Sequence, residues 1–214
     1  MRRSIKQFVA SLVDADLPIG FRNPYDCPTA ARNLERFLST KDPKVSRFLL
    51  VGEAPGYRGA ATSGVAFCSL SILLDDWGDP WRAFGSSSGY DACSSATFWR
   101  EATATALWSC LSEILKDEAM PLTWNAVPFH PVNNGNEANA PVKVHEVSIG
   151  TPWLEALMEM FPESRLIAVG RRAEDALRTI GLEHDAVRHP ARGRKREFQT
   201  GMTDALRNRA TAGT

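Results

Sequence analysis

The chain has 214 residues, of which 43% are hydrophobic and 23% are charged, and its formal net charge is +0. This length is sufficient for one domain with a sizeable buried core. The neutral balance excludes bulk electrostatic binding to nucleic acid, although it is compatible with a local basic patch. The apolar run 8–13 is short and is followed by Asp14, so we expect no export signal, no membrane span and a cytoplasmic protein.

The four cysteines are widely separated in the sequence: they are Cys27, Cys68, Cys93 and Cys110. No Cys-x-x-Cys pair occurs, and no His stands at zinc-ligand spacing from any of them. We therefore expect reduced, mostly buried thiols and no metal site.

The N-terminal third of the chain predicts two helices and a strand. Residues 4–13 have helical spacing, and residues 28–38 form a second helix with Pro28 in its first turn. The apolar run 46–51 is too short for an ordinary helix and breaks into Gly52-Glu53-Ala54-Pro55-Gly56, as a buried parallel strand that enters a loop does. Taken alone, such a loop is more often a plain connection than a ligand site.

Strands and helices alternate through the rest of the chain. We expect helices at 70–74, from a Ser94 or Ser95 cap to Lys116, from a Thr151 cap to 161, and at 173–180. Further strands are expected at 121–128, 165–170 and 184–188. This alternation predicts a single domain of the α/β class, with three layers and a central four-stranded parallel sheet that carries helices on both faces.

Three of the predicted strands end in polar residues, namely Glu53, Asn125 and His189. Parallel strands present such residues at the same edge of the sheet. Each is weak by itself, since Asn after a strand is usually a turn residue and His before Pro is usually a loop residue. In this order and spacing they resemble the motifs of the uracil-DNA glycosylase superfamily, which are a strand followed by Gly-Glu-Ala-Pro-Gly, a strand-end Asn and a closing His-Pro-Ser/Ala. The resemblance covers residues 46–195, with a helical N-terminal extension before it.

The most similar branch is the iron–sulfur glycosylases of family 4, which share Gly52 to Gly56, Gly64 to Phe67 and Asn125 to Val127. That branch has cysteine ligands where this chain has Phe129 and Gly150, and Cys27 stands alone near the N-terminus. We therefore expect no iron–sulfur cluster and no other cofactor.

The resemblance implies how a base would be recognised and released. Enzymes of this kind flip the base out of the DNA stack into a tight pocket. Asn125 corresponds to the amide that reads uracil and Phe67 to the ring that stacks on it, while His189 donates to the departing uracil oxygen. Glu53 stands near the sugar, where a carboxylate positions water and offsets positive charge. The remaining substrate-binding residues implied by the motif are Gly52, Ala54, Pro55, Gly56 and Tyr57.

Two of these positions depart from other branches of the superfamily. Ala54 stands where those enzymes have Asp, and Gly56 stands where they have a Tyr that excludes thymine. The identity of the water-positioning group and the means of excluding thymine are therefore open.

The segment 188–196 is the one dense basic run in the chain. As a composition it is compatible with a solvated loop, but in the resembled family the residues after His-Pro enter the minor groove. We expect Arg192 to fill the gap left by the flipped base and Arg194, Lys195 and Arg196 to contact phosphates.

The sequence as a whole indicates a monomeric, metal-free, monofunctional uracil-DNA glycosylase of base-excision repair that acts on single- or double-stranded DNA. Three alternatives are open. The first is a glycosylase for a broader set of deaminated bases, such as hypoxanthine or xanthine. The second is a protein that traps the abasic product covalently, for which the aligned nucleophile position holds Asn139. The third is an inactive member that only binds nucleic acid or nucleotides.

Overall fold

A four-stranded parallel sheet forms the centre of the computed structural model, which describes residues 4–93, 97–115, 118–132, 139–190 and 194–207. The strand order is β3 (Leu122–Asn125), β2 (Phe48–Gly52), β5 (Arg165–Val169) and β6 (Asp185–Val187). All four strands pair in parallel. The predicted α/β sheet is therefore confirmed, and each strand lies within or one residue beyond its predicted segment.

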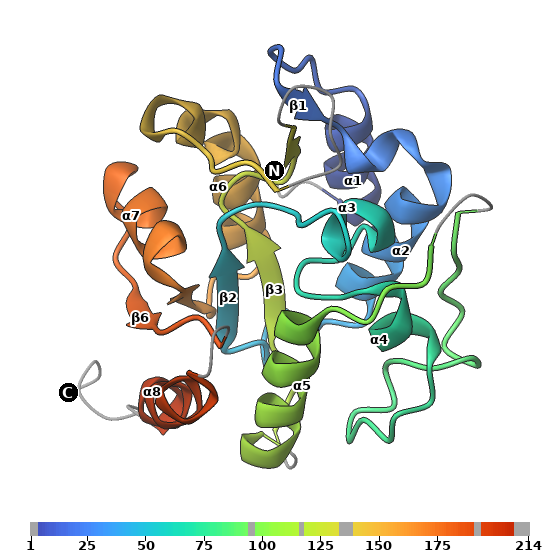
Figure 1. Cartoon of the computed structure of the whole chain (residues 1–214), viewed down its shortest axis with the longest axis vertical. Helices are drawn as coiled ribbons and strands as arrows, with labels where there is room; N and C mark the ends of the chain where they lie inside the picture. Colours follow the sequence, from blue (N-terminus) through green and yellow to red (C-terminus); the bar gives the residue numbers. More distant parts are fainter. Residues whose placement is uncertain (1–3, 94–96, 116–117, 133–138, 191–193, 208–214) are drawn as a thin grey trace.

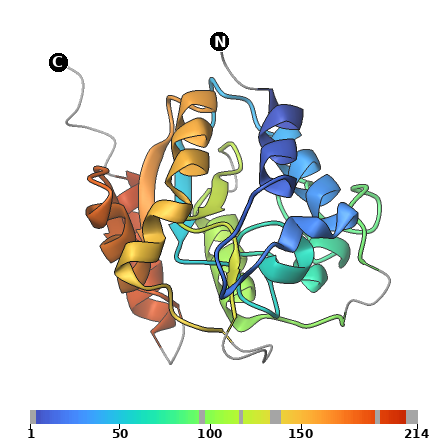
Figure 2. The same ribbon diagram turned by 90° about the horizontal axis from the view of Figure 1, so that it is seen from above.

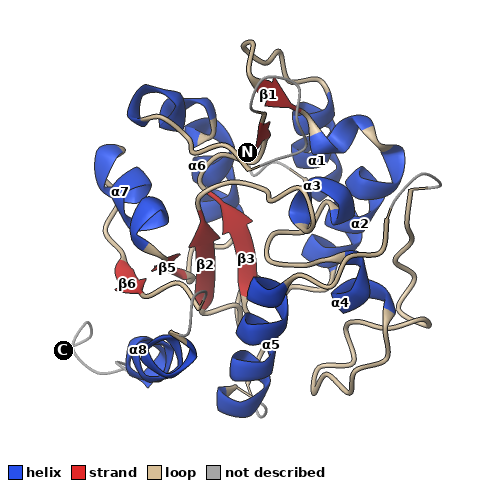
Figure 3. Ribbon diagram, in the orientation of Figure 1, coloured by secondary structure: helices blue, strands red, loops and turns tan. Residues whose placement is uncertain are grey.

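Helices surround the sheet (Figures 1 and 3). They are α1 (Ile5–Val13), α2 (Pro28–Ser39), α3 (Ala60–Ser63), α4 (Leu70–Leu74), α5 (Ala102–Ile114), α6 (Thr151–Met160), α7 (Arg171–Thr179) and α8 (Lys195–Arg207). Two 3-10 helices, η1 (Pro24–Asp26) and η2 (Val144–Ile149), lie in connections. Right-handed crossovers place α5 on one face of the sheet and α6 and α7 on the other. Figures 1 and 2 show α1 to α4 gathered beyond the β3 edge, away from α7.

The N-terminal helix α1 belongs to the same core as the sheet. Its first turn is closed by a capping box between Ser4 and Gln7. It buries Phe8, whose ring lies 5.4 Å from that of Trp124 in β3. The segment that precedes the motif-bearing region therefore supports the strand that ends at Asn125.

Two predicted helix starts differ from the structure. Helix α5 begins at Ala102 with Glu101 as its cap residue, whereas Ser94 and Ser95 lie outside the described residues. Thr151 is the first residue of α6 and Gly150 is the cap, so the predicted Thr151 cap is wrong. A cap side chain must reach back to a free N–H group, and local sequence does not show whether packing allows that.

Short or polar elements escaped prediction. Strands β1 (Phe21–Arg22) and β4 (His130–Pro131) form an antiparallel pair of two residues each, too short to show an alternating pattern. The basic run is also not all loop, because Lys195 begins α8.

The cysteines form one disulfide, between Cys27 and Cys93, whereas Cys68 and Cys110 are buried thiols. The expectation of reduced thiols is therefore wrong for Cys27 and Cys93. Sixty-six positions separate them in the chain, so their proximity is decided by tertiary packing. The buried Asn33 amide of α2 also holds this segment, since its Nδ2 donates to the Asp91 carbonyl at 2.9 Å and its Oδ1 accepts from the Asp91 N–H at 3.1 Å. The chain before α5 is thereby fastened to α2.

Within the described residues, no helix combines the length and hydropathy needed to cross a membrane.

Candidate active site

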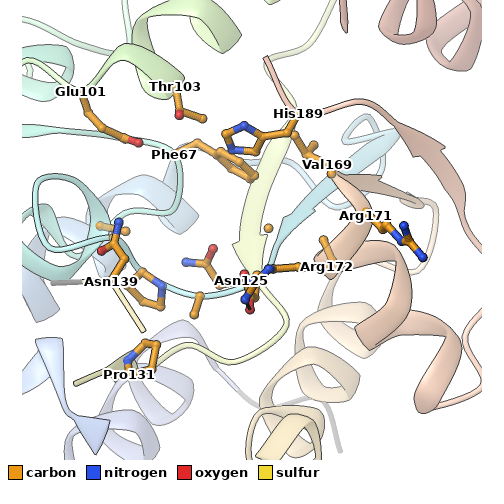
Figure 4. Close-up of a pocket in the computed structure, with 18 of the residues that line it drawn as sticks. Phe67, Glu101, Thr103, Asn125, Pro131, Asn139, Val169, Arg171, Arg172 and His189 are labelled. Carbon is orange, nitrogen blue, oxygen red and sulfur yellow. Dashed lines mark hydrogen bonds and ion pairs between the residues drawn. The ribbon is translucent and has the colours of Figure 1, made fainter. Parts of the chain in front are cut away.

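A pocket of about 500 Å³ lies at the carboxyl edge of the sheet (Figure 4). This is the edge at which α/β proteins bind ligands, and the volume is in the usual range for a small-molecule site. Its lining includes the residues Gly52, Glu53, Ala54, Pro55, Gly56, Phe67, Glu101, Thr103, Asn125, Asn139, Gly170, Arg172 and His189. The structure thus brings together the three strand ends that the sequence singled out.

Gly52 lies at the pocket floor, where two other pocket residues pack against it. The parallel register pairs Gly52 of β2 with Asn125 of β3, and the Ala126 N–H donates to the Gly52 carbonyl at 2.8 Å. A Cβ atom at Gly52 would lie 2.7 Å from Asn125 Oδ1 and 2.9 Å from Phe67 Cζ. Only a residue without a side chain lets the amide and the ring share this backbone position.

The Asn125 side chain offers a donor and an acceptor in a confined space. The residue is only 7% exposed, and among the described residues no hydrogen bond to its side chain is formed. Burying an amide without a partner costs free energy, so such a group is suited to a ligand that pairs with it. The Asn125 amide therefore marks the base of the pocket as a polar recognition point.

Phe67 is held in an unusual backbone conformation. Its φ is +57°, which is uncommon for a residue with a side chain. Two hydrogen bonds hold this turn: Trp108 Nε1 donates to the Phe67 carbonyl at 3.1 Å, and Thr123 Oγ1 donates to the Ala66 carbonyl at 2.9 Å. Backbone strain of this kind is found where a side chain must take a defined direction, and here it fixes an aromatic ring in the pocket wall.

Glu53 is anchored by two partners that the sequence did not indicate. Its Oε1 accepts the Val142 N–H at 2.9 Å and lies 3.2 Å from Nη1 of Arg172. The Glu53 side chain is 25% exposed, so the ion pair is partly desolvated. These contacts fix a carboxylate in the wall, and among the described residues Oε2 forms no hydrogen bond or ion pair. No local pattern reveals Arg172, because it lies 119 positions from Glu53.

His189 follows β6 and closes the pocket mouth beside Phe67 (Figure 4). Its ring packs on Gly170, where a Cβ atom would come within 3.0 Å of His189 Cβ, and Gly170 has a φ of +92°. His189 is exposed as a residue, but the pocket walls partly desolvate its ring and so lower the pKa of His189. The imidazole is therefore neutral near pH 7 and acts as an uncharged hydrogen-bonding group.

The loop after β2 is braced on its outer side. The Pro55 carbonyl accepts a hydrogen bond from His130 Nδ1 at 2.7 Å, and the Tyr57 N–H donates to Asn139 Oδ1 at 2.9 Å. Ala54, Pro55 and Gly56 line the pocket as predicted. The Tyr57 ring does not, because it lines a neighbouring cleft. The structure therefore does not place Tyr57 with the other predicted substrate-binding residues.

Glu101 is a pocket residue that the sequence did not single out. It caps α5, and its Oε2 lies 2.8 Å from where a Cβ of Gly59 would be. Burial raises the pKa of this carboxyl, while hydrogen bonds from Thr103 and the Ala104 backbone oppose the shift. In the sequence, a glutamate before an alanine-rich helix indicates only a surface position. The place of Glu101 in the pocket is therefore seen only in the fold.

Of the predicted DNA-binding residues, Arg194 and Arg196 are not among the described residues that line the pocket. Arg194 and Arg196 are exposed, and Arg194 pairs with Glu197 at 3.5 Å. Lys195 is the first residue of α8, and Arg192 lies outside the described residues.

The residues present do not fit an iron–sulfur cluster. Cys27 is in the disulfide, and Phe129 is fully buried against Trp153 with ring centroids 5.1 Å apart. At Gly150 a Cβ atom would approach the Ala126 carbonyl oxygen to 1.8 Å, so this position cannot carry a cysteine without backbone movement. In the described part of the chain, no three His, Cys, Asp or Glu side chains gather as metal ligands.

Comparison with known proteins identifies a family. The family model described as the uracil DNA glycosylase superfamily matches residues 40–207. The crystal structure of SMUG2 from Pedobacter heparinus has a TM-score of 0.64 at 16% identity, covering 94% of this chain and 96% of that chain, which shows a shared fold. The UNG structure from Nitratifractor salsuginis has a TM-score of 0.44 at 18% identity, covering 96% of this chain and 98% of that chain. No curated protein sequence matches significantly.

Gly52→Ala tests the close packing at the pocket floor. The new methyl group displaces the Asn125 amide and the Phe67 ring, so we expect a loss of about 1–3 kcal/mol in the free energy of unfolding, measured by denaturant titration. Gly201→Ala in α8 is the matched control, because its Cβ would meet Val187 only at 3.7 Å and a helical alanine is favoured. Equal stability of Gly52→Ala and the parent would contradict this packing.

The lowered pKa of His189 predicts a pH dependence of stability. The unfolded chain binds a proton at this residue near pH 6.5, but the folded chain does so only at lower pH. Stability from this residue is therefore complete above pH 6.5 and is lost as the pH falls below it. Denaturation at pH 7.5 and 5.5 should show a smaller acid loss for His189→Asn than for the parent. Identical losses would be inconsistent with a desolvated His189.

Proposed function

The chain belongs to the uracil DNA glycosylase superfamily, and on that premise we propose that it hydrolyses the N-glycosidic bond of uracil in DNA as a monofunctional enzyme of base-excision repair. The observation that carries this proposal is the convergence of the Asn125 amide, the Phe67 ring and the His189 ring on one pocket. Superfamily membership supports a hydrolytic DNA glycosylase, and the pocket chemistry supports uracil as its base.

Uracil recognition follows from the pocket floor. The pairing edge of uracil presents an acceptor, a donor and an acceptor, and the Asn125 amide complements two of these groups. Because Asn125 is buried, a base that cannot pair with it leaves the amide unsatisfied. Phe67 supplies the stacking surface for a flipped base, and this contact contributes about 1–3 kcal/mol.

Bond cleavage places negative charge on the departing uracil and positive charge on the sugar. The neutral His189 ring donates a hydrogen bond to the developing uracil anion, a contact that strengthens in the transition state. Glu53, held by Arg172 and the Val142 N–H, supplies a fixed carboxylate that positions water and offsets the cationic sugar. In this scheme Arg172 is a positioning residue for Glu53.

The substrate is uracil-containing DNA. Arg192, Arg194, Lys195 and Arg196 follow His189 in the chain, so a duplex or strand that delivers a base to the pocket passes close to them. Phosphate contacts from this basic segment explain how a protein with no net charge holds DNA. We propose that it acts as a cytoplasmic monomer without a cofactor.

Single-turnover excision from uracil-containing oligonucleotides tests the proposal. We expect His189→Ala to slow excision by about 10²–10³-fold, because a transition-state hydrogen bond is removed. Asn125→Ala and Glu53→Gln should also slow it. The matched controls His184→Ala and Glu159→Gln change the same residue types outside the pocket and should leave the rate unchanged. A parent protein that releases no uracil would contradict the proposed function.

A glycosylase with a broader base range is the second candidate, and one observation favours it. At Gly56, which lines the pocket, a Cβ atom would meet only Asn139 at 3.6 Å, so no side chain narrows the pocket where other branches have Tyr. Oligonucleotides that contain thymine, hypoxanthine or xanthine in place of uracil decide between the two. Release of these bases at rates similar to uracil supports the broader range.

Covalent trapping of the abasic product is not favoured. The aligned position holds Asn139, an amide whose Oδ1 accepts the Tyr57 N–H, and an amide is not a nucleophile toward the sugar. A protein–DNA band that persists on a denaturing gel would contradict this.

A further inference from the structure

A second cleft of about 330 Å³ lies beside the proposed base pocket. Tyr57, Ala61, Trp99 and the disulfide-bonded Cys27 and Cys93 are among its lining residues. We call it the flanking cleft.

The two cavities share a wall built from two short segments of chain. Gly56 and Ala60 face the base pocket, whereas their neighbours Tyr57 and Ala61 face the flanking cleft. On the second segment, Glu101 faces the pocket and Trp99 faces the cleft. Two residues span at most about 7 Å of chain, so the cavities are separated by a distance comparable to one nucleotide step in an extended strand.

The flanking cleft exposes aromatic rings together with a cation. Arg58 Cζ lies 4.4 Å from the Trp99 ring centroid and 5.0 Å from the Tyr57 ring centroid. Trp99 is 40% exposed, although large aromatic side chains are usually well buried. A second cation, Arg22, lines the cleft. Among the described residues, neither Arg58 nor Arg22 forms an ion pair. The Arg58 guanidinium thus lies over both rings, and a planar partner that stacks on them takes its place. The cleft also carries the carboxylate of Asp26, so an anion is held by Arg22 and Arg58 and not by the cleft as a whole.

Both sides of the cleft are braced. The Tyr57 backbone is held by Asn139 Oδ1 at its N–H and by Thr62 Oγ1 at its carbonyl, each at 2.9 Å. The disulfide joins Cys27 and Cys93, two residues that line the cleft. A braced surface loses little conformational entropy when a ligand is bound.

We propose that the flanking cleft binds the base of a nucleotide adjacent to the flipped uracil in an unpaired DNA strand. The base stacks on Trp99 and Tyr57 in the place of the Arg58 guanidinium, which turns away from the rings to contact the strand's phosphate. Any base has a π-face for such stacking, so the contact does not depend on sequence. A base in a duplex is already stacked and paired, and therefore cannot enter. The proposal rests on the proposed function for the position of the uracil, and it assigns the neighbouring base a stacking site of its own.

Fluorescence of 2-aminopurine tests the cleft without requiring catalysis. The probe is a single-stranded oligonucleotide with 2-aminopurine beside 2′-fluoro-deoxyuridine, whose electron-withdrawing fluorine opposes the cationic sugar and so resists cleavage. Insertion of 2-aminopurine between aromatic rings changes its emission. We expect such a change with the probe on one side of the uridine, and no change when the same strand is paired in a duplex.

Variants then assign the change to the cleft. Trp99→Ala should weaken binding of the single strand by at least about fivefold and abolish the emission change, whereas Trp99→Phe should retain both in part. Arg58→Gln should weaken binding and reduce its dependence on salt. Phe98→Ala is the matched control, because Phe98 is adjacent and 60% exposed but does not line the cleft, and it should behave as the parent.

The outcomes separate this proposal from the proposed function. A parent that excises uracil but gives no emission change on either side, or a Trp99→Ala variant that binds single strands as the parent does, overturns the flanking cleft. An emission change lost in Trp99→Ala supports the cleft even if the parent releases no uracil, in which case only the proposed function fails.

Discussion

The site depends on one constraint, the parallel pairing of Gly52 with Asn125. This pairing aligns the ends of β2 and β3, so that the loop after β2 and the Asn125 amide lie at the same level of the sheet. Because Gly52 has no side chain, Phe67 and Asn125 both pack against its Cα. Phe67 must adopt a positive φ to reach that position, and Trp108 and Thr123 hold the turn that allows it. Core residues therefore fix the pocket that the loops complete.

The surrounding structure also fixes the charged and titratable groups of the pocket. The Glu53 carboxylate is held in the wall by Arg172 and by the Val142 N–H. Desolvation keeps His189 neutral, and burial raises the pKa of Glu101. In the proposed function, the Glu53 anion lies near the sugar and the uncharged His189 donor near the leaving base, which matches the charge that develops as a glycosidic bond breaks. The pocket thus has its electrostatics in place before a substrate enters.

The chain segment just before α5 contributes residues to both cavities, with Glu101 in the pocket and Trp99 in the flanking cleft. The disulfide and the Asn33 amide fasten residues 91–93 to α2, and the chain then passes Trp99 on its way to α5. One wall therefore serves two cavities, the pocket at the sheet edge and the flanking cleft. The link between α2 and this wall explains why a segment with little regular structure takes part in the site.

The sequence alone determined the four-stranded sheet and most of the helices, because strand and helix runs are local patterns. The resemblance of its motifs then singled out Glu53, Asn125, Phe67 and His189. Tertiary structure alone decided the partners of those residues. The disulfide of Cys27 and the ion pair of Glu53 with Arg172 join residues that are far apart in the sequence. The burial of Glu101 and the position of Tyr57 in the flanking cleft likewise depend on segments that no local pattern connects. Packing brings them together, since burial and pairing are properties of the folded chain and not of neighbouring residues.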